Sequence, residues 1–410
     1  MSNSWLARAA QGCSLPILIG IAAMVTPATA GELRTGGYLG AELRVFPSSP
    51  SFTEQHDATF SPSLVLEPEW TFESEDAQNR LTFVPFARWD SYDQHRTHAD
   101  VREAKYLRIG DGWDVVLGFD RVFWGVTEAR HLIDIINQTD GVEDVDQEDK
   151  LGQPMVNLNF VQPWGTTRLY VLPGFRERTF PDDEARLRGR LPIATNRTEY
   201  SSGAEDRHVD FAARYSHSYR GFDFGLSQFW GTGREPRLDP VLRNGSPVLA
   251  PFYDIINQTG LDAQYTTGSL QLKLELMTMS GWGDRIWATD VGLEYTFFDV
   301  FGSGSDVGAL FEYLYDNRDL EEAPPTIFDS DFFFGLRYGA NDRRDTQLLL
   351  GAVVDRGNLG TTSSLEFSTR LTDRLRLEIE GRGFFNIRSD DLLGGVDRDD
   401  FILARIKYFL

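Results

Sequence analysis

The stretch RLRLEIEGR, from Arg374 to Arg382, decides the fold because its side chains change in kind at every step. Successive residues of a β-strand point to opposite faces. One face of this strand then carries Leu375, Leu377 and Ile379, and the other carries Arg374, Arg376, Glu378, Glu380 and Arg382. A charge facing hydrocarbon near mid-depth costs roughly 2–4 kcal/mol. The stretch therefore predicts a membrane strand with one face toward lipid and the other toward water.

The same alternation recurs along the chain. In 361–371, Leu365 and Phe367 oppose Glu366 and Arg370. In 270–280, four leucines at even positions oppose Gln271, Lys273 and Glu275. In 206–217, Val209, Phe211, Ala213 and Tyr215 oppose Asp210 and Arg214. Charges gathered on one face of so many strands predict a shared water-filled lumen.

Eighteen candidate strands are separated by turn residues. They fall at 36–46, 60–73, 79–92, 101–108, 113–121, 154–162, 167–173, 206–217, 221–231, 254–267, 270–280, 285–298, 305–318, 327–339, 345–355, 361–371, 374–387 and 397–410. Sixteen strands remain an alternative count, because short apolar runs can be split or merged. Either number is even, as single-chain bacterial membrane barrels require.

The lengths of the connections agree with a barrel. Every connection after an even-numbered strand is short, and the long ones, 121–153, 174–205 and 231–253 among them, follow odd-numbered strands. Such sorting is typical of outer-membrane barrels, which have short periplasmic turns and long extracellular loops. We therefore predict an all-β, transmembrane, antiparallel up-and-down β-barrel formed by 31–410. Because strand pattern begins near Gly36, we expect no separate plug domain.

The first thirty residues predict a cleaved export signal. Arg8 is their only charge, Leu15 to Val25 is a short apolar run, and Ala28-Thr29-Ala30 supplies small residues before a cut. Cys13 precedes the apolar run, whereas a lipid-anchor cysteine would follow it, so it is expected to be discarded with the signal.

Composition excludes other classes. The formal net charge of −22 disfavours a nucleic-acid binder, whose affinity comes from neutralising phosphates. After residue 30, no apolar run approaches the roughly twenty residues that a membrane helix needs. Abundant Phe, Tyr, Trp and Gly in short alternating runs favour a membrane barrel or a large secreted β-protein.

The C-terminal stretch carries a resemblance. Its apolar face is formed by Ile402, Ala404, Ile406, Tyr408 and Leu410. It resembles the last strand of Gram-negative outer-membrane barrels, although that pattern usually ends in Phe. The nearest analogues are alginate-export and substrate-specific porin families. The resemblance implies an outer-membrane location, with membrane lipid, lipopolysaccharide and the barrel-insertion machinery as partners.

The long connection 121–153 is the leading candidate for a functional site. Val126, Ile133 and Ile136 have helical spacing, so its first part is expected to be helical. Its eight carboxylates against three basic residues leave it five charges negative. The acidic string is Glu143, Asp144, Asp146, Glu148 and Asp149.

Basic residues supply a counterpart to this string. Those expected on the lumen wall are Arg370, Arg374, Arg376, Arg382, Arg405 and Lys407, and those expected on the next long loop are Arg176, Arg178, Arg186, Arg188 and Arg190. General porins fold an acidic loop into the barrel opposite wall arginines. The resemblance implies a similar constriction here. The alternative is that these charges pair across strands and the acidic loop stays at the surface.

The hexapeptide Asp-Ile-Ile-Asn-Gln-Thr occurs at 134–139 and again at 254–259. Both copies lie toward the long-loop rim of the predicted barrel, so they are able to pack together inside it. An old hairpin duplication without a present role explains the repeat equally well.

Enzymatic signals are weak. Ser216 and His217 are adjacent in a strand and so point to opposite faces, which separates nucleophile from base. His95 and His98, with Asp93 and Asp100, form only a loose metal-like group. We expect no catalysis, metal or cofactor.

Two functions from different classes follow. The first is a porin-like channel for small hydrophilic solutes, with anionic solutes among the candidates. The second is a structural or adhesive barrel whose loops bind surface polysaccharide or divalent cations. An open pore would discriminate between them.

Overall fold

A computed structural model describes residues 31–410 of the chain. The expected export signal, 1–30, lies outside the described residues. Within the described part, helical structure is limited to 3₁₀ segments of three or four residues. None of these helices has the length and apolarity to cross a membrane.

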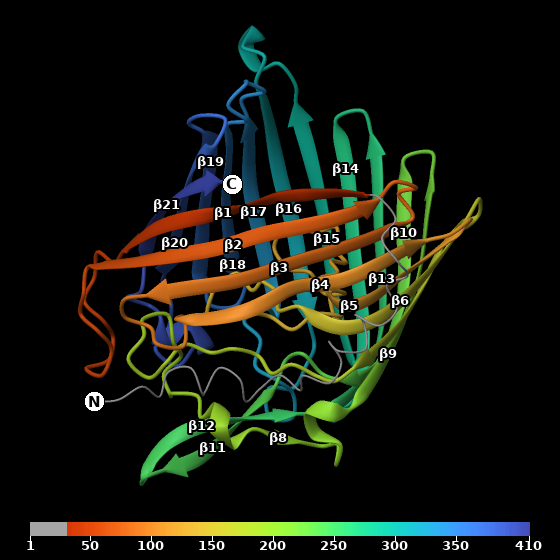
Figure 1. The fold of residues 1–410 in the computed structure, drawn as a ribbon. Coiled ribbons are helices and arrows are strands. Elements are labelled where there is room, and N and C mark those ends of the chain that lie inside the picture. The colour runs from red at the N-terminus through yellow and green to blue at the C-terminus, as the bar shows by residue number, and fades with distance from the viewer. Residues whose placement is uncertain (1–30) are drawn as a thin grey trace, which may run out of the picture.

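Eighteen strands form one closed antiparallel β-barrel (Figure 1). Each strand pairs with its neighbours along the chain, and β21 pairs with β1 to close the ring. The barrel strands are β1 (Gly31–Val45), β2 (Phe60–Ser74), β3 (Asn79–Asp90), β4 (His98–Ile109), β5 (Trp113–Asp120), β6 (Gln153–Gln162), β7 (Gly165–Pro173), β9 (Val209–Tyr219), β10 (Phe222–Thr232), β13 (Ile255–Thr267), β14 (Leu270–Ser280), β15 (Ile286–Phe297), β16 (Asp306–Asp316), β17 (Ser330–Gly339), β18 (Gln347–Asp355), β19 (Thr361–Arg370), β20 (Leu375–Phe385) and β21 (Phe401–Phe409).

The predicted fold is confirmed, because each of the eighteen candidate strands corresponds to one barrel strand. The sixteen-strand alternative is excluded. The largest differences in bounds are at the two ends of the barrel sequence. The strand β1 begins at Gly31, and β21 begins at Phe401 because the residues before it form a 3₁₀ helix and a loop.

The predicted alternation is also present. On β1, Leu39 and Leu43 are 47% and 39% exposed, whereas Glu42 and Arg44 between and beside them are 5% and 8% exposed. Exposed aromatic side chains gather near both strand ends, as in the aromatic girdles of membrane barrels. Near the long-loop rim they are Phe60, Trp89, Phe211, Trp230, Trp287 and Tyr315, and near the short-turn rim Trp113, Trp164, Tyr219, Phe222, Tyr265, Tyr295 and Tyr338. The outer face is therefore suited to lipid and the inner face to water.

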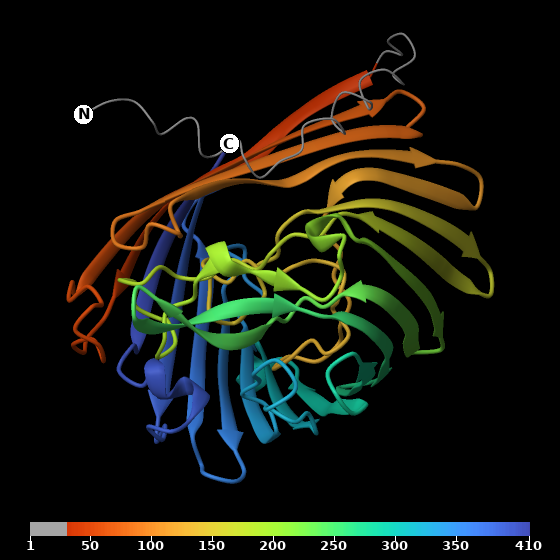
Figure 2. The same cartoon turned by 90° about the horizontal axis from the view of Figure 1, so that it is seen from below.

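The long loops contain a second sheet that the sequence did not predict. Its three strands are β8 (Glu199–Tyr200), β11 (Arg237–Arg243) and β12 (Ser246–Tyr253). In Figure 1 this sheet lies below the barrel at the long-loop rim, and Figure 2 shows it crossing the outline of the strand ring. It partly covers that mouth of the barrel.

Candidate pore constriction

The connection between β5 and β6 contains no helix, so the expected helical start of 121–153 is wrong. Its apolar residues are instead buried singly in an extended, irregular chain. Trp124, Ile133 and Ile136 are 3% exposed or less. They pack against inward-facing side chains of the barrel, including Tyr170 on β7 and Met277 on β14. Sequence spacing could not distinguish this burial from one face of a helix, because both place the same residues inside.

This apolar cluster lies within the strand ring and occupies one side of it. The wall contributes residues from β6, β7, β9, β10, β13, β14 and β15, among them Met155, Leu172, Phe229 and Ile256. In Figure 2, which views the molecule from the long-loop side, the connection runs inside the outline of the barrel. The part of the ring from β16 through β21 to β4 has no comparable apolar filling from this cluster.

The two copies of the repeated hexapeptide meet in this cluster. Ile135 and Ile136 of the first copy and Ile256 of the second belong to it. Beside them, the Gln258 amide donates a hydrogen bond to the carbonyl of Leu132 at 3.4 Å. The copies have different conformations, because the first lies in the loop and the second begins β13. Their contact is therefore not a symmetric pairing of strands.

Wall carboxylates bind the backbone of the connection. Glu275 on β14 accepts hydrogen bonds from the backbone nitrogens of Val126 and Thr127 at 2.7 and 3.2 Å. Glu312 on β16 accepts from the backbone nitrogens of Glu128 and Ala129, both at 2.8 Å. A buried chain outside a β-sheet has backbone N–H groups without a neighbouring strand to accept their hydrogen bonds, so these groups need other acceptors. The two glutamates supply them.

The connection also contacts opposite walls. Asp140 lies 2.7 Å from Arg102 on β4, and Arg130 lies 3.0 Å from Asp316 on β16. In the ring, β4 is the fourth strand and β16 the thirteenth, so nine steps separate them in either direction around the eighteen strands. These two contacts therefore lie across the lumen from each other.

The first half of the acidic string is buried and paired. Glu143 lies 2.5 Å from Arg88 on β3, and both side chains are at most 5% exposed. Asp140, just before the string, contacts His98 at 3.4 Å as well as Arg102. Burial opposes the ionisation of Asp140, but the hydrogen bond to His98 and the charge of Arg102 outweigh it and lower its pKa. These carboxylates therefore act as anchors.

Arg382 on β20 is the predicted wall residue that meets the string. Its guanidinium lies 2.7 Å from Asp146, 3.9 Å from Asp144 and 3.0 Å from Glu366 on β19. Asp144 is buried, whereas Asp146 is exposed to the lumen. Desolvation by the surrounding protein and the negative charge of Asp144 raise the pKa of Asp146 above its usual value.

Glu148 and Asp149 complete the string and are exposed. His131 lies 3.5 Å from Glu148, and this contact lowers the pKa of Glu148. Desolvation by the surrounding protein, added to the charges of Glu143 and Asp144, raises the pKa of Asp149 to about 6. The string therefore presents Asp146, Glu148 and Asp149 to water and keeps Glu143 and Asp144 in the wall contact.

The other five predicted wall residues do not contact the string. Arg405 pairs with Glu42, Glu378 and Glu380 of neighbouring strands at 2.6 to 3.1 Å, and Lys407 pairs with Glu378. Arg370 and Arg376 lie 3.9 and 2.8 Å from Asp345 near the short-turn rim. Arg374 donates to the hydroxyl of Tyr408 at that rim. For these residues, the structure agrees with the alternative in which wall charges pair with nearby residues, and not with a wall of unpaired basic side chains facing the string.

Two arginines that the sequence did not single out, Arg88 on β3 and Arg102 on β4, hold carboxylates of the connection. Arg88 and Arg102 are 6% and 2% exposed and hold Glu143 and Asp140. Arg88 alternates with Trp89, so the pattern that revealed β20 could have found it. Arg102 is hidden by a register shift between β3 and β4 at Val84 and Pro85. Such a bulge interrupts the alternation from which inward residues are read.

The loop arginines contact other loop segments and the loop end of β4. Arg176 pairs with Asp100 at 2.7 Å, and Arg186 pairs with Asp399 near the start of β21. Arg188 donates to the carbonyls of Gly189 and Arg190. Arg178 is partly buried, and its backbone nitrogen donates to the hydroxyl of Tyr253 on β12. Within the described residues, none of these arginines is paired with the five acids of the string.

Two clusters have ligand types suited to metals. His98, Asp140 and Glu143 lie within 4.8 Å of one another, but Arg102 and Arg88 already occupy the two carboxylates. At the loop end of β17 and β18, Asp329, Asp331 and Asp355 lie equally close. Backbone nitrogens of the surrounding turns donate to each of these three. The loose group expected around His95 is not formed, because His95 contacts the carbonyl of Phe180 instead.

A wider space lies toward the short-turn rim. A cavity of about 510 Å³ is lined by inward residues of β1 to β5, among them Arg34, Glu73, Arg80, Glu103 and Lys105. Opposite charges alternate along this lining, for example Arg80 and Glu73 at 2.5 Å. The lumen therefore continues beyond the connection as a polar, water-accessible space.

Comparison with known proteins bears on the fold. OpdQ of Pseudomonas aeruginosa is 9% identical, with 93% of this chain and 99% of that chain covered and a TM-score of 0.51. A triple mutant of the porin of Rhodopseudomonas blastica is 12% identical, with 92% and 99% covered and a TM-score of 0.43. No family model and no curated protein matches the chain. The chain therefore has the fold of a porin-like β-barrel, and these comparisons show no family.

Proposed function

From this fold, we propose that the protein is an outer-membrane channel through which small hydrophilic solutes diffuse. The observation that carries the proposal is the closed ring of eighteen strands with an apolar exterior and a charged interior. Barrels of this size leave an aqueous channel unless something fills them. The polar cavity behind β1 to β5 supports an open path on the short-turn side.

The connection 121–153 narrows this path. Its contacts with β4 and β16 support a crossing of the lumen, and its apolar cluster fills the side of β6 to β15. The connection covers β19 and β20 least, since no inward residue of these two strands is buried, and we place the remaining passage beside them. Asp146, Glu148 and Asp149 line it from the connection, and Arg382 lines it from the wall.

The charge balance favours cations over the anions that the sequence suggested. Arg382 has three carboxylates within 3.9 Å, and Arg405 has three within 3.1 Å. Arginines neutralised in this way attract anions weakly, because neighbouring carboxylates cancel their field. Of the exposed carboxylates of the string, Asp146 shares Arg382 with two other acids, Glu148 lies 3.5 Å from His131, and Asp149 has no ion pair among the described residues. Negative charge therefore exceeds positive charge at this position. Rings of Asp and Glu side chains are the usual means of selecting cations in pores.

A single experiment tests both the channel and its selectivity. The wild-type protein in planar lipid bilayers should conduct and show a reversal potential favouring potassium over chloride in a salt gradient. The triple variant Asp146→Asn, Glu148→Gln, Asp149→Asn should conduct with a reversal potential closer to zero. The triple variant Asp111→Asn, Asp342→Asn, Asp373→Asn, which alters exposed short-turn residues, is the matched control and should shift it less.

Absence of conductance in the purified wild-type protein would reject the channel. Conductance with equal selectivity in all three proteins would reject the role of the string. A loop-binding or adhesive barrel predicts the first of these outcomes. Recovery of the protein in the outer-membrane fraction, with its N-terminus at Gly31, would test the proposed location and the export signal.

A further inference from the structure

Arg44 on β1 is a buried cation without a hydrogen-bonded counter-ion. It is 8% exposed, and its Nε and Nη2 atoms find no hydrogen-bond partner in residues 31–410. The centre of its guanidinium lies 4.6 Å from the centre of the Phe401 ring. Stacking of this kind leaves the N–H groups at the guanidinium edge free to bind something else. The charges of Asp144, Glu42 and Asp90 act on Arg44 from beyond 4 Å, but none of them accepts a hydrogen bond from it. Buried N–H donors without an acceptor are costly, so this position calls for a ligand.

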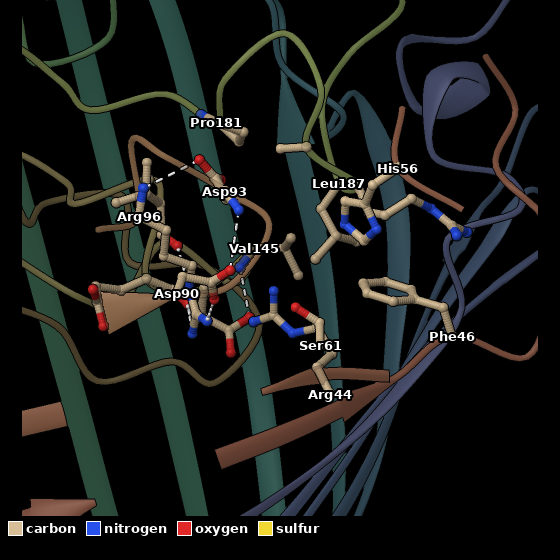
Figure 3. Close-up of a pocket in the computed structure, with 16 residues that line it drawn as sticks. Arg44, Phe46, His56, Ser61, Asp90, Asp93, Arg96, Val145, Pro181 and Leu187 are labelled. Carbon is tan, nitrogen blue, oxygen red and sulfur yellow. Dashed lines mark hydrogen bonds and ion pairs between the residues drawn. The ribbon is translucent and has the colours of Figure 1, made fainter. Parts of the chain in front are cut away.

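The free edge of Arg44 faces a small cavity (Figure 3). The cavity has a volume of about 30 Å³ and lies where β1 to β3 meet three long connections. His56 also lines it, and its Nδ1 likewise lacks a partner among the described residues. Ser61 on β2 adds a hydroxyl. Since a single water needs about 10–15 Å³ by the same measure, the space suits a monatomic ion and excludes a phosphate.

The carboxylates around this cavity are already engaged. Asp90 lies 2.7 Å from Arg96, and Glu143 lies 2.5 Å from Arg88. Asp93 accepts hydrogen bonds from the backbone nitrogens of His95 and Arg96 at 2.9 and 3.1 Å. Asp144 accepts one from Val145 and lies 3.9 Å from Arg382. Arg44 is therefore the one charged group of the described lining that has neither an ion pair nor a hydrogen bond of its own.

His56 is suited to act as a neutral donor. Burial and the nearby charge of Arg186 lower the pKa of His56 below its usual value. A neutral imidazole carries one N–H, and in the tautomer protonated at Nδ1 that unpartnered nitrogen can donate to a ligand. A hydrogen-bond donor beside a guanidinium favours an anion over a cation.

We propose that this cavity binds one monovalent anion of the size of chloride, held by the guanidinium edge of Arg44 and by Nδ1 of His56. The bound anion links the wall at β1 to the loop 46–59 and, through the shared cavity, to 141–145 and 185–187. It compensates the charge of Arg44, and so stabilises the packing of these loops against the barrel. The proposal does not depend on whether the barrel conducts.

Crystals of the full protein soaked in sodium bromide provide the direct test. We expect an anomalous peak within hydrogen-bonding distance of Arg44 Nε or Nη2 in the wild type. The variant Arg44→Met should lose that peak. Only water at this position in the wild type, or a bromide peak that persists in the variant, would overturn the proposal.

Thermal unfolding in detergent gives an independent measurement. A ligand that binds only the folded state raises the melting temperature with its concentration. The wild type should therefore melt higher in sodium chloride than in sodium gluconate of equal ionic strength, because gluconate is too large for the cavity. The variant Arg388→Met removes an exposed arginine paired with Asp390 and should keep this difference. Equal melting of the wild type in both salts would contradict the proposal, even if Arg44→Met does not fold.

Discussion

Replacing Glu275 with leucine should release the connection 121–153 from the wall while leaving the barrel intact. The Oε1 atom of Glu275 accepts hydrogen bonds from the backbone nitrogens of Val126 and Thr127. The Thr127 hydroxyl also lies 2.8 Å from this oxygen, but its single proton has a second acceptor in the carbonyl of Arg130 at 2.7 Å. Leaving a buried donor unsatisfied costs about 1–3 kcal/mol. The two backbone donors therefore give about 2–6 kcal/mol as an upper range. Even the lower figure changes the ratio of packed to released connection by about thirtyfold.

Glu275→Gln is the matched control, because its amide oxygen can take the place of Oε1 and keep both backbone donors. Its amide nitrogen would replace Oε2, whose contact with the backbone nitrogen of Ile133 is long, at 3.4 Å. Asp290 lies directly opposite Glu275 in the register of β14 and β15, and neither of its carboxylate oxygens has a partner among the described residues. The new amide N–H can therefore donate to Asp290. We expect Glu275→Gln to behave like the wild type.

Single-channel recording and limited proteolysis together provide the assay. Glu275→Leu should show larger and noisier conductance and should be cleaved by trypsin at Arg130, which the wild type protects. Both variants should retain the heat-resistant mobility of a folded barrel in electrophoresis. Equal behaviour of the leucine and glutamine variants would refute the reasoning, since it would mean that the acceptor oxygen does not hold the connection.

Three further predictions concern charge and the membrane face. Because the pKa of Asp149 is raised to about 6, its negative charge is lost as pH falls through 6, so cation selectivity should decrease between pH 7 and pH 5, and Asp149→Asn should reduce this pH dependence. Arg88→Met removes the arginine partner of buried Glu143 and one of the three arginines around Glu42, which keeps Arg96 and Arg405. This loss of about 3–5 kcal/mol should lower the unfolding temperature far more than Arg34→Met at an exposed pair. Val291→Arg places a charge on the lipid face of β15 and should destabilise the barrel in lipid by roughly 2–4 kcal/mol, whereas Val291→Leu should not, as judged by urea unfolding in vesicles.

The barrel was predictable from the sequence because its physics is local to each strand. A two-residue alternation such as that of Leu375 to Arg382 is imposed by lipid on one side and water on the other, and it needs no knowledge of distant residues. The same holds for the short turns on one rim. By contrast, β8, β11 and β12 form a loop sheet at the mouth of the barrel, where no lipid imposes an apolar face.

The site was less predictable because it depends on which charges meet. Six basic wall residues were expected to face the acidic string, and Arg382 is the one that contacts it. Sequence identifies inward charges but not their partners, and Arg405 is taken up by carboxylates from β1 and β20. Arg102 shows a second limit, since one bulge changes which side chains face inward. Arg102 was therefore accessible only from the strand register, whereas alternation alone would have placed Arg88 inside.

A connection of irregular backbone can lie inside a barrel only if the wall provides what a β-sheet or water would otherwise provide. Glu275 and Glu312 accept four of its backbone N–H donors, and the buried isoleucines replace exposed apolar surface with wall contacts. The buried acids of the wall and the buried apolar residues of the connection therefore depend on each other. The acids need the backbone donors of the connection, and the connection needs the acids in order to stay packed inside the barrel. This explains why the negative charge of the connection is placed late in its sequence. Its first half must approach acidic strands β14 and β16, where further carboxylates would repel, whereas its second half reaches the arginines of β3, β4 and β20.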